Sequence, residues 1–136
     1  MPPVLLTKRI EFAASHRYGR PEWDDEKNRT VFGRCYNPPA HGHNYLLELT
    51  VSGEIDQKTG MVVNLFDLKR VLLDVIEEFD HKNLNLDVDF MRGKMCSIEN
   101  LVMGIWNELK PLLPGSVTLH CIKLVETPRI YVEYYG

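Results

Sequence analysis

The sequence lacks the features of a disulfide-rich, membrane-spanning or nucleic-acid-binding protein. Its three cysteines, Cys35, Cys96 and Cys121, are odd in number and widely spaced, which argues against a disulfide framework or a cage of thiolates around zinc. No apolar run approaches the ~18 residues that a membrane span needs, and residues 1–4 lack the charged and apolar pattern of a signal peptide. A formal net charge of -3 gives no electrostatic reason for nucleic-acid binding. We therefore expect a soluble, cytoplasmic protein with neither nucleic acid nor membrane as a partner.

Hydrophobic patterns in the sequence predict an α+β fold in one domain. The 136 residues suffice for one core and are too few for two, so the expected domain covers residues 1–136. Period-two alternation and branched residues predict four strands, at residues 4–12, 45–53, 117–125 and 130–135. Helical spacing of apolar residues predicts two helices, which begin after the caps Asn64 and Ser97. The order ββααββ predicts a four-stranded antiparallel sheet with both helices on one face.

Residues 17–40 connect the first two predicted strands. This connection exceeds the ~12–15 residues beyond which structureless loops are uncommon, and it mixes acidic and basic side chains. We expect most of these side chains to be solvated. A subset of the arginines could contact an anionic substrate.

Three histidines are expected to converge at one end of the sheet. Side chains alternate along a strand, so the apolar face of the first strand ends in His16, and that of the second begins with His41 and His43. Antiparallel pairing of the two strands would place His16 next to the other two histidines. Three neutral imidazoles predict a divalent metal site that keeps one position open, as catalytic zinc sites do.

Further candidates for chemistry lie outside the histidine pattern. Cys35 precedes the histidine pair, where a positive or metallic neighbour could turn its thiol into a thiolate base. Asp80 could orient His81 and stabilise its charged form, although such a pair is also common at helix ends. Glu126 could accept hydrogen bonds from a ligand or simply be exposed to solvent. His120, within a strand and without a partner, is interpreted as structural.

Several short motifs together resemble those of the 6-pyruvoyltetrahydropterin synthase family, which also includes 6-carboxytetrahydropterin synthases. The motifs are Phe12-Ala13-Ala14-Ser15-His16, Cys35-x5-His41-Gly42-His43-Asn44-Tyr45, Asp80-His81-Lys82-Asn83-Leu84-Asn85, Ser97-Ile98-Glu99-Asn100 and Glu126-Thr127. Each motif is modest alone, but in this order they are specific, and the resemblance extends over residues 7–134.

The resemblance implies the tunnelling fold, in which strands from several subunits close into a barrel with the helices outside. It also implies a homohexamer of two stacked trimers, which fits the self-association that open sheet edges favour. One Zn²⁺ per subunit would be held by His16, His41 and His43. Active sites in this family lie between subunits.

The resemblance also assigns roles to the other candidate residues. Cys35 would be the thiolate base, and Asp80 with His81 would complete a catalytic triad across a subunit boundary. Glu126 would anchor the pterin ring by accepting its N–H groups. The backbone near Ser97 and Ile98 would help to bind the substrate.

The implied reaction converts 7,8-dihydroneopterin triphosphate to 6-pyruvoyltetrahydropterin and triphosphate in tetrahydrobiopterin biosynthesis, with Mg²⁺ on the triphosphate. The alternative is 6-carboxytetrahydropterin synthase of queuosine biosynthesis, which releases acetaldehyde with the triphosphate. The five residues between Cys35 and His41 favour the pyruvoyl branch, since the carboxy branch commonly has a shorter gap. A second alternative is a non-catalytic pterin- or metal-binding assembly. Retention of Cys35, Asp80, His81 and Glu126 argues against it.

Overall fold

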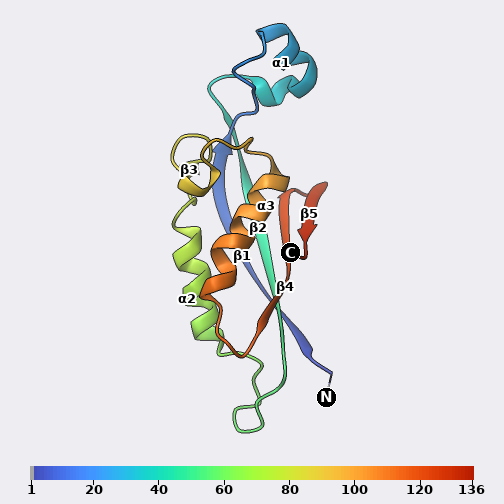
Figure 1. The fold of residues 1–136 in the computed structure, drawn as a ribbon, viewed down its shortest axis with the longest axis vertical. Helices are drawn as coiled ribbons and strands as arrows, with labels where there is room; N and C mark the ends of the chain where they lie inside the picture. The colour runs from blue at the N-terminus through green and yellow to red at the C-terminus, as the bar shows by residue number, and fades with distance from the viewer. Residues whose placement is uncertain (1) are drawn as a thin grey trace.

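The computed structural model describes residues 2–136, which form a mixed five-stranded sheet with the helices α2 and α3 packed on one face (Figure 1). The strand order is β3-β1-β2-β4-β5. The strands are β1 (Val4–His16), β2 (His41–Gly53), β3 (Lys82–Asn83), β4 (Thr118–Thr127) and β5 (Ile130–Tyr134). The helices are α1 (Asp25–Phe32), α2 (Leu65–Ile76) and α3 (Ile98–Leu109), with short 3-10 helices η1 (Gly33–Tyr36), η2 (Asp89–Met91) and η3 (Lys110–Leu112). None of the helices among the described residues has the length and apolarity needed to cross a membrane.

The long strands β1 and β2 form the centre of the sheet and determine where the site lies. They pair antiparallel from Val4↔Gly53 to His16↔His41, so the end of β1 meets the start of β2. This confirms the predicted pairing. Both strands continue to the end of the sheet from which α1 projects (Figure 1).

The hydrophobic core lies between one sheet face and the helices. Alternate side chains of β2, among them Leu47 and Leu49, are fully buried, as period-two alternation requires. Leu68 of α2 and Leu101 of α3 are also fully buried and belong to the same core cluster. The predicted placement of both helices on one face is confirmed.

Both predicted helix caps are present. The Asn64 side chain accepts a hydrogen bond from the Phe66 N–H at 2.9 Å at the start of α2. Ser97 accepts one from the Asn100 N–H at 3.2 Å at the start of α3. Each cap satisfies a backbone donor that has no partner within its helix.

The predicted four-stranded antiparallel sheet omitted β3. The four predicted strands do pair antiparallel in the order β1-β2-β4-β5, and the two-residue β3 adds a parallel strand beside β1. It is fixed by backbone contacts, including the hydrogen bond from the Leu84 N–H to the Ser15 carbonyl at 2.8 Å. A polar two-residue strand has no hydrophobic pattern, so periodicity could not predict it.

The connection between β1 and β2 also contains a helix where we predicted a solvated loop. Helix α1 is capped by Asp24, whose carboxylate accepts from the Lys27 N–H at 2.8 Å. Its one buried residue, Asn28, exchanges hydrogen bonds with the backbone N–H and carbonyl of Arg20. This polar helix therefore depends on one buried amide rather than on an apolar stripe, and helical periodicity did not reveal it.

Candidate metal centre and active site

The three predicted histidines meet at the β1 and β2 ends. His16 stands opposite His41 in the sheet, and His43 lies two residues further along the same face of β2. One ring nitrogen of each histidine lies within 4.8 Å of the others. This confirms that the strand pattern brings the three side chains together, in an arrangement that could hold a metal ion.

The hydrogen bonds of His16 determine which nitrogen faces this cluster. Its Nδ1 lies 2.7 Å from the Cys96 carbonyl oxygen, and its Nε2 lies 3.0 Å from His41 Nε2. A carbonyl oxygen only accepts, so neutral His16 carries its proton on Nδ1. Its Nε2 lone pair is therefore directed at the cluster, which is the orientation that a metal ligand needs.

The imidazole of His43 provides a further indication that the cluster fits a metal. Its Nε2 is buried and has no hydrogen-bond partner among the described residues. A buried nitrogen without a partner is costly. A divalent ion coordinated by three imidazoles would remove that cost and is compatible with this donor set.

Burial keeps the three imidazoles uncharged. It lowers the pKa of His16 to about 4, an effect only partly opposed by the hydrogen bond to Cys96 and reinforced by His41 and His43. Burial also lowers the pKa of His41 and that of His43. Neutral imidazole is the form that coordinates metal, so the cluster is ready to bind an ion at neutral pH.

In the metal-free protein, the low pKa of His16 is expected to make folding stability fall as the pH drops from about 6.5 to about 4. Within this window the unfolded chain carries a proton on His16 and the folded chain does not, so the free energy of unfolding rises with pH. The gap between the two pKa values corresponds to a loss on the order of 3 kcal/mol below pH 4. Urea unfolding in the presence of a chelator at several pH values measures it.

His16→Gln, which keeps an amide donor for the Cys96 carbonyl, should reduce this dependence and leave the part that the lowered pKa values of His41 and His43 contribute. His120→Gln, at an exposed position of β4, should leave it as in the wild type. Equal pH profiles for wild type and His16→Gln would contradict the assignment of the proton to His16.

Glu126, near the end of β4, lies beside the histidines. Its Oε1 is 3.9 Å from His43 Nε2, and its buried Oε2 has no hydrogen-bond partner among residues 2–136. Burial raises the pKa of this carboxyl; His41 opposes the shift, and Glu99 adds to it. A buried carboxylate oxygen without a donor is available to accept hydrogen bonds from a ligand.

Two tyrosines that we did not predict as site residues form the wall around Glu126. The Tyr45 hydroxyl is buried without a partner, and its ring packs against those of His16 and His43. Tyr18 packs on His16 with ring centroids 5.2 Å apart, and burial followed by the charge of Glu126 raises its pKa to about 12. Both follow a histidine by two residues, so period-two alternation could have identified them.

Cys35 occupies the 3-10 helix η1 and is partly buried. Its carbonyl accepts a hydrogen bond from the Tyr18 N–H at 2.9 Å, which ties η1 to the chain just beyond His16. Burial, and then the charge of Glu126, raises the pKa of the thiol. A thiolate at this position therefore needs additional positive charge.

Asp80 and His81 form a hydrogen-bonded pair on the β3 side of β1. The Asp80 carboxylate accepts from the Ala13 N–H at 3.0 Å and from His81 Nδ1 at 2.8 Å. The backbone of His81 has φ +60, an unusual value for a residue other than glycine, and its side chain is 82% exposed. Among residues 2–136 no hydrogen bond joins this pair to Cys35.

Ser97 and Ile98 start α3 next to Tyr18. The Ser97 side chain is engaged in the cap, and the Ile98 backbone lies within hydrogen-bonding reach of the Tyr18 phenol, where it lowers the pKa of that group. Glu99, in the first turn of α3, is close enough to Glu126 to raise its pKa. The start of α3 therefore faces the same space as Glu126.

Comparison with known proteins identifies the family. A family model described as 6-pyruvoyl tetrahydropterin synthase matches residues 5–136. The chain belongs to this family. It is 45% identical over 132 residues to the 6-pyruvoyl tetrahydrobiopterin synthase of Pongo abelii, with 96% of this chain and 90% of that protein covered. It is 44% identical over 132 residues to the Homo sapiens protein of the same name, with the same coverage.

A solved structure agrees with these sequence relationships. The structure of Caenorhabditis elegans 6-pyruvoyl tetrahydropterin synthase superposes on this chain with a TM-score of 0.94 at 33% identity, and covers 100% of this chain and 97% of that chain. Membership of the 6-pyruvoyl tetrahydropterin synthase family, inferred above from short motifs, is thereby confirmed, as is the α+β fold.

In this member of the 6-pyruvoyl tetrahydropterin synthase family, the single chain assembles only part of the predicted site. The histidine triad, Cys35 and Glu126 lie around the ends of β1 and β2, where Tyr18 has close neighbours in all three groups. Asp80 and His81 instead belong to the opposite edge of β1, beside β3.

Proposed function

We propose that this chain is a zinc-dependent lyase that converts 7,8-dihydroneopterin triphosphate to 6-pyruvoyltetrahydropterin and triphosphate. The single observation that carries the proposal is the convergence of three uncharged imidazoles beside the buried Glu126 carboxylate. It is found in a chain that matches the 6-pyruvoyl tetrahydropterin synthase model over residues 5–136. The printed names of the relatives at 45% and 44% identity support the same activity.

His16, His41 and His43 would hold one Zn²⁺ per subunit. The ion would act as a Lewis acid toward the hydroxyl groups of the substrate side chain and acidify the adjacent C–H bonds. The buried Nε2 of His43, which has no hydrogen-bond partner within residues 2–136, supports this placement. Mg²⁺ would accompany the substrate's triphosphate rather than occupy a protein site.

Glu126 would anchor the pterin ring. Its carboxylate can accept two N–H groups of the pyrimidine edge, and charge-assisted hydrogen bonds of this kind are strong in a buried site. The unpartnered Oε2 supports this role. Backbone groups of Ser97 and Ile98, at the start of α3, would complete the ring's contacts.

Cys35 would remove protons from the carbon atoms of the substrate side chain, and His81 would help to transfer them. Elimination of triphosphate and inward movement of the ring double bond need no external oxidant, because the oxidation and the reduction occur within one substrate. Burial and Glu126 raise the pKa of the Cys35 thiol, so a nearby cation must oppose them. The metal and the charged form of His81 from an adjacent subunit would supply that charge, and the Asp80 carboxylate would stabilise the charged His81.

This division of the site requires an oligomer, and we propose a hexamer of two stacked trimers whose sheets close into a barrel. Two features of the chain support it. His81 is exposed, has a positive φ and, among residues 2–136, forms no hydrogen bond with Cys35. Strand β5 stands at an edge of the sheet, where its outer backbone groups can pair with another strand. Residues 1–136 would act as one domain, and its three free cysteines suit the cytoplasm.

The experiment that tests this function is product analysis. Zinc-loaded protein with Mg²⁺ should convert 7,8-dihydroneopterin triphosphate to a 6-pyruvoyl product, identified by mass, and prior removal of the metal with a chelator should abolish conversion. Release of acetaldehyde with a 6-carboxy pterin would instead assign the chain to the 6-carboxytetrahydropterin branch. Absence of any conversion, with zinc bound, would contradict a catalytic role.

A further inference from the structure

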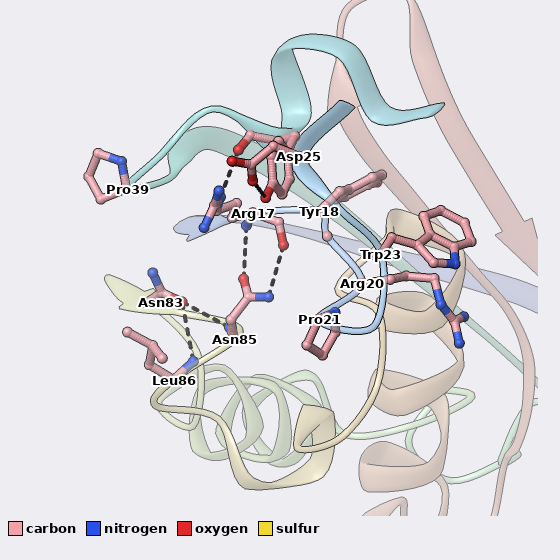
Figure 2. Close-up of a pocket in the computed structure, with 12 residues that line it drawn as sticks. Arg17, Tyr18, Arg20, Pro21, Trp23, Asp25, Pro39, Asn83, Asn85 and Leu86 are labelled. Carbon is pink, nitrogen blue, oxygen red and sulfur yellow. Dashed lines mark hydrogen bonds between the residues drawn. The ribbon is translucent and has the colours of Figure 1, made fainter. Parts of the chain in front are cut away.

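A cavity of about 610 Å³ lies between the loop after β1 and the loop after β3 (Figure 2). We call it the Arg17 cavity. Its walls include Arg17, Tyr18, Arg20, Trp23, Asn85 and Leu86. Tyr18 is common to both sites, because its ring also packs on His16. The Arg17 cavity therefore adjoins the candidate metal centre.

Arg17 is held firmly in this cavity. Its backbone N–H donates to Asn85 Oδ1 at 2.8 Å, and its carbonyl accepts from Asn85 Nδ2 at 2.9 Å (Figure 2). Its Nε donates to the Tyr36 carbonyl at 2.7 Å, and the guanidinium lies 4.4 Å from the centre of the Tyr36 ring. These contacts fix the plane of the guanidinium and leave its two terminal amino groups free to bind a ligand.

Among residues 2–136, Arg17 takes part in no ion pair, although it is half-buried and Asp25 also lines the cavity. Its neighbours differ in this respect: Arg20 donates to Glu22 at 2.6 Å, and the Asp25 carboxylate accepts from the Tyr36 hydroxyl at 2.6 Å. A fixed and unpaired guanidinium suits an anion that two parallel N–H groups can bind, as they bind phosphate.

We propose that the Arg17 cavity binds the triphosphate of the substrate, with Arg17 as its main cationic contact. This inference rests on the proposed function, in which the substrate side chain lies at the histidine triad and Glu126 holds the ring. The phosphate groups at the far end of that side chain must then occupy a space that adjoins the triad. The Arg17 cavity adjoins it through Tyr18, which lines the cavity and packs its ring on His16.

The test uses inorganic triphosphate as the probe and isothermal titration of the zinc-loaded protein at fixed ionic strength. Arg17→Gln keeps a side-chain amide but removes the charge and the two parallel donors. We expect it to weaken triphosphate binding by about tenfold or more, since charge-assisted contacts of this kind are strong. Its zinc content should remain that of the wild type.

A second variant tests the cavity independently, in case Arg17→Gln loses triphosphate binding only because its structure is disturbed. Leu86 lines the cavity and is 75% exposed, so Leu86→Glu adds a carboxylate there without disturbing the core. It should weaken triphosphate binding by about fivefold or more through like-charge repulsion. The control is Arg92→Gln, which removes an arginine that pairs with Asp89 at 2.7 Å outside the cavity and should bind triphosphate as the wild type does.

Titration with 7,8-dihydroneopterin, which carries no phosphate, separates this inference from the proposed function. Arg17→Gln and Leu86→Glu should bind it with wild-type affinity. Wild-type triphosphate binding in both variants, or an equal loss in Arg92→Gln, would overturn the Arg17 cavity and leave the pterin site intact. Failure of the wild type to bind dihydroneopterin would overturn the proposed function itself.

Discussion

Replacement of Cys35 by alanine is expected to lower turnover by about a thousandfold while zinc and pterin binding remain as in the wild type. Loss of a positioned proton acceptor typically costs about 10²- to 10⁴-fold. The substitution should be tolerated, because the side chain is only partly buried and the hydrogen bond that holds η1 is made by the Cys35 carbonyl, which alanine retains. Single-turnover assays with saturating substrate, together with zinc analysis, measure the effect.

Cys121→Ala is the matched control for Cys35→Ala. Cys121 is another free cysteine, on β4, and burial raises the pKa of its thiol as it does for Cys35. It takes part in none of the proposed steps, so its removal should leave turnover at the wild-type level. A Cys35→Ala protein that retains more than about a tenth of wild-type turnover would contradict the role of Cys35 as the base. It would favour a binding assembly only if the wild type is also inactive.

Glu126→Gln is expected to weaken the binding of 7,8-dihydroneopterin by about a hundredfold, or about 2.7 kcal/mol. Glutamine has nearly the same shape, but it replaces one acceptor oxygen by an NH₂ group that opposes the N–H groups of the pterin. The same change should preserve or raise the melting temperature, because the native fold buries this carboxylate and leaves Oε2 without a donor. Equilibrium titration and thermal unfolding measure the two effects.

Glu48 provides the matched control for Glu126. It is also a buried glutamate, on β2, but it pairs with Arg9 at 2.8 Å and with Lys123 at 3.6 Å, away from the triad. Glu48→Gln should therefore lower stability and leave pterin affinity unchanged, which is the reverse of the pattern for Glu126→Gln. Wild-type pterin affinity in Glu126→Gln would refute the anchor role.

These two predictions separate two tasks that a single buried site has to perform. Glu126 would bind the ring, and Cys35 would act on the side chain, so one variant should change affinity and the other turnover. Both groups lie around Tyr18, whose pKa is raised first by burial and then by Glu126, with a further contribution from Cys35. Because its pKa is raised, the Tyr18 phenol stays neutral and can donate a hydrogen bond beside these acidic side chains.

The histidine triad could be predicted from the sequence because strand geometry has a simple period. Alternation places His41 and His43 on one face, and the pairing of β1 with β2 brings His16 opposite His41. The starts of α2 and α3 were predictable for a similar reason, since Asn64 and Ser97 are local caps that act within one helical turn.

The parts of the fold that were missed depend on polar contacts rather than on apolar periodicity. Helix α1 is stabilised by local hydrogen bonds of the buried Asn28 to Arg20, and β3 by backbone hydrogen bonds to the distant strand β1. Neither leaves a periodic pattern of apolar residues. The secondary structure of such a polar segment depends on which hydrogen-bond donors and acceptors surround it in the folded chain.

Local patterns in the sequence were enough to predict two helices on one face of an antiparallel sheet, the convergence of the three histidines and, through the motifs, the family. The folded structure was needed to show that the His16 Nε2 is directed at the cluster and that Asn85 binds the Arg17 backbone. It also showed that, among residues 2–136, Oε2 of Glu126 has no donor and Arg17 forms no ion pair. The physical reason is that periodicity fixes which face a side chain occupies. The protonation, hydrogen bonding and charge of that side chain depend on partners that only folding brings within reach.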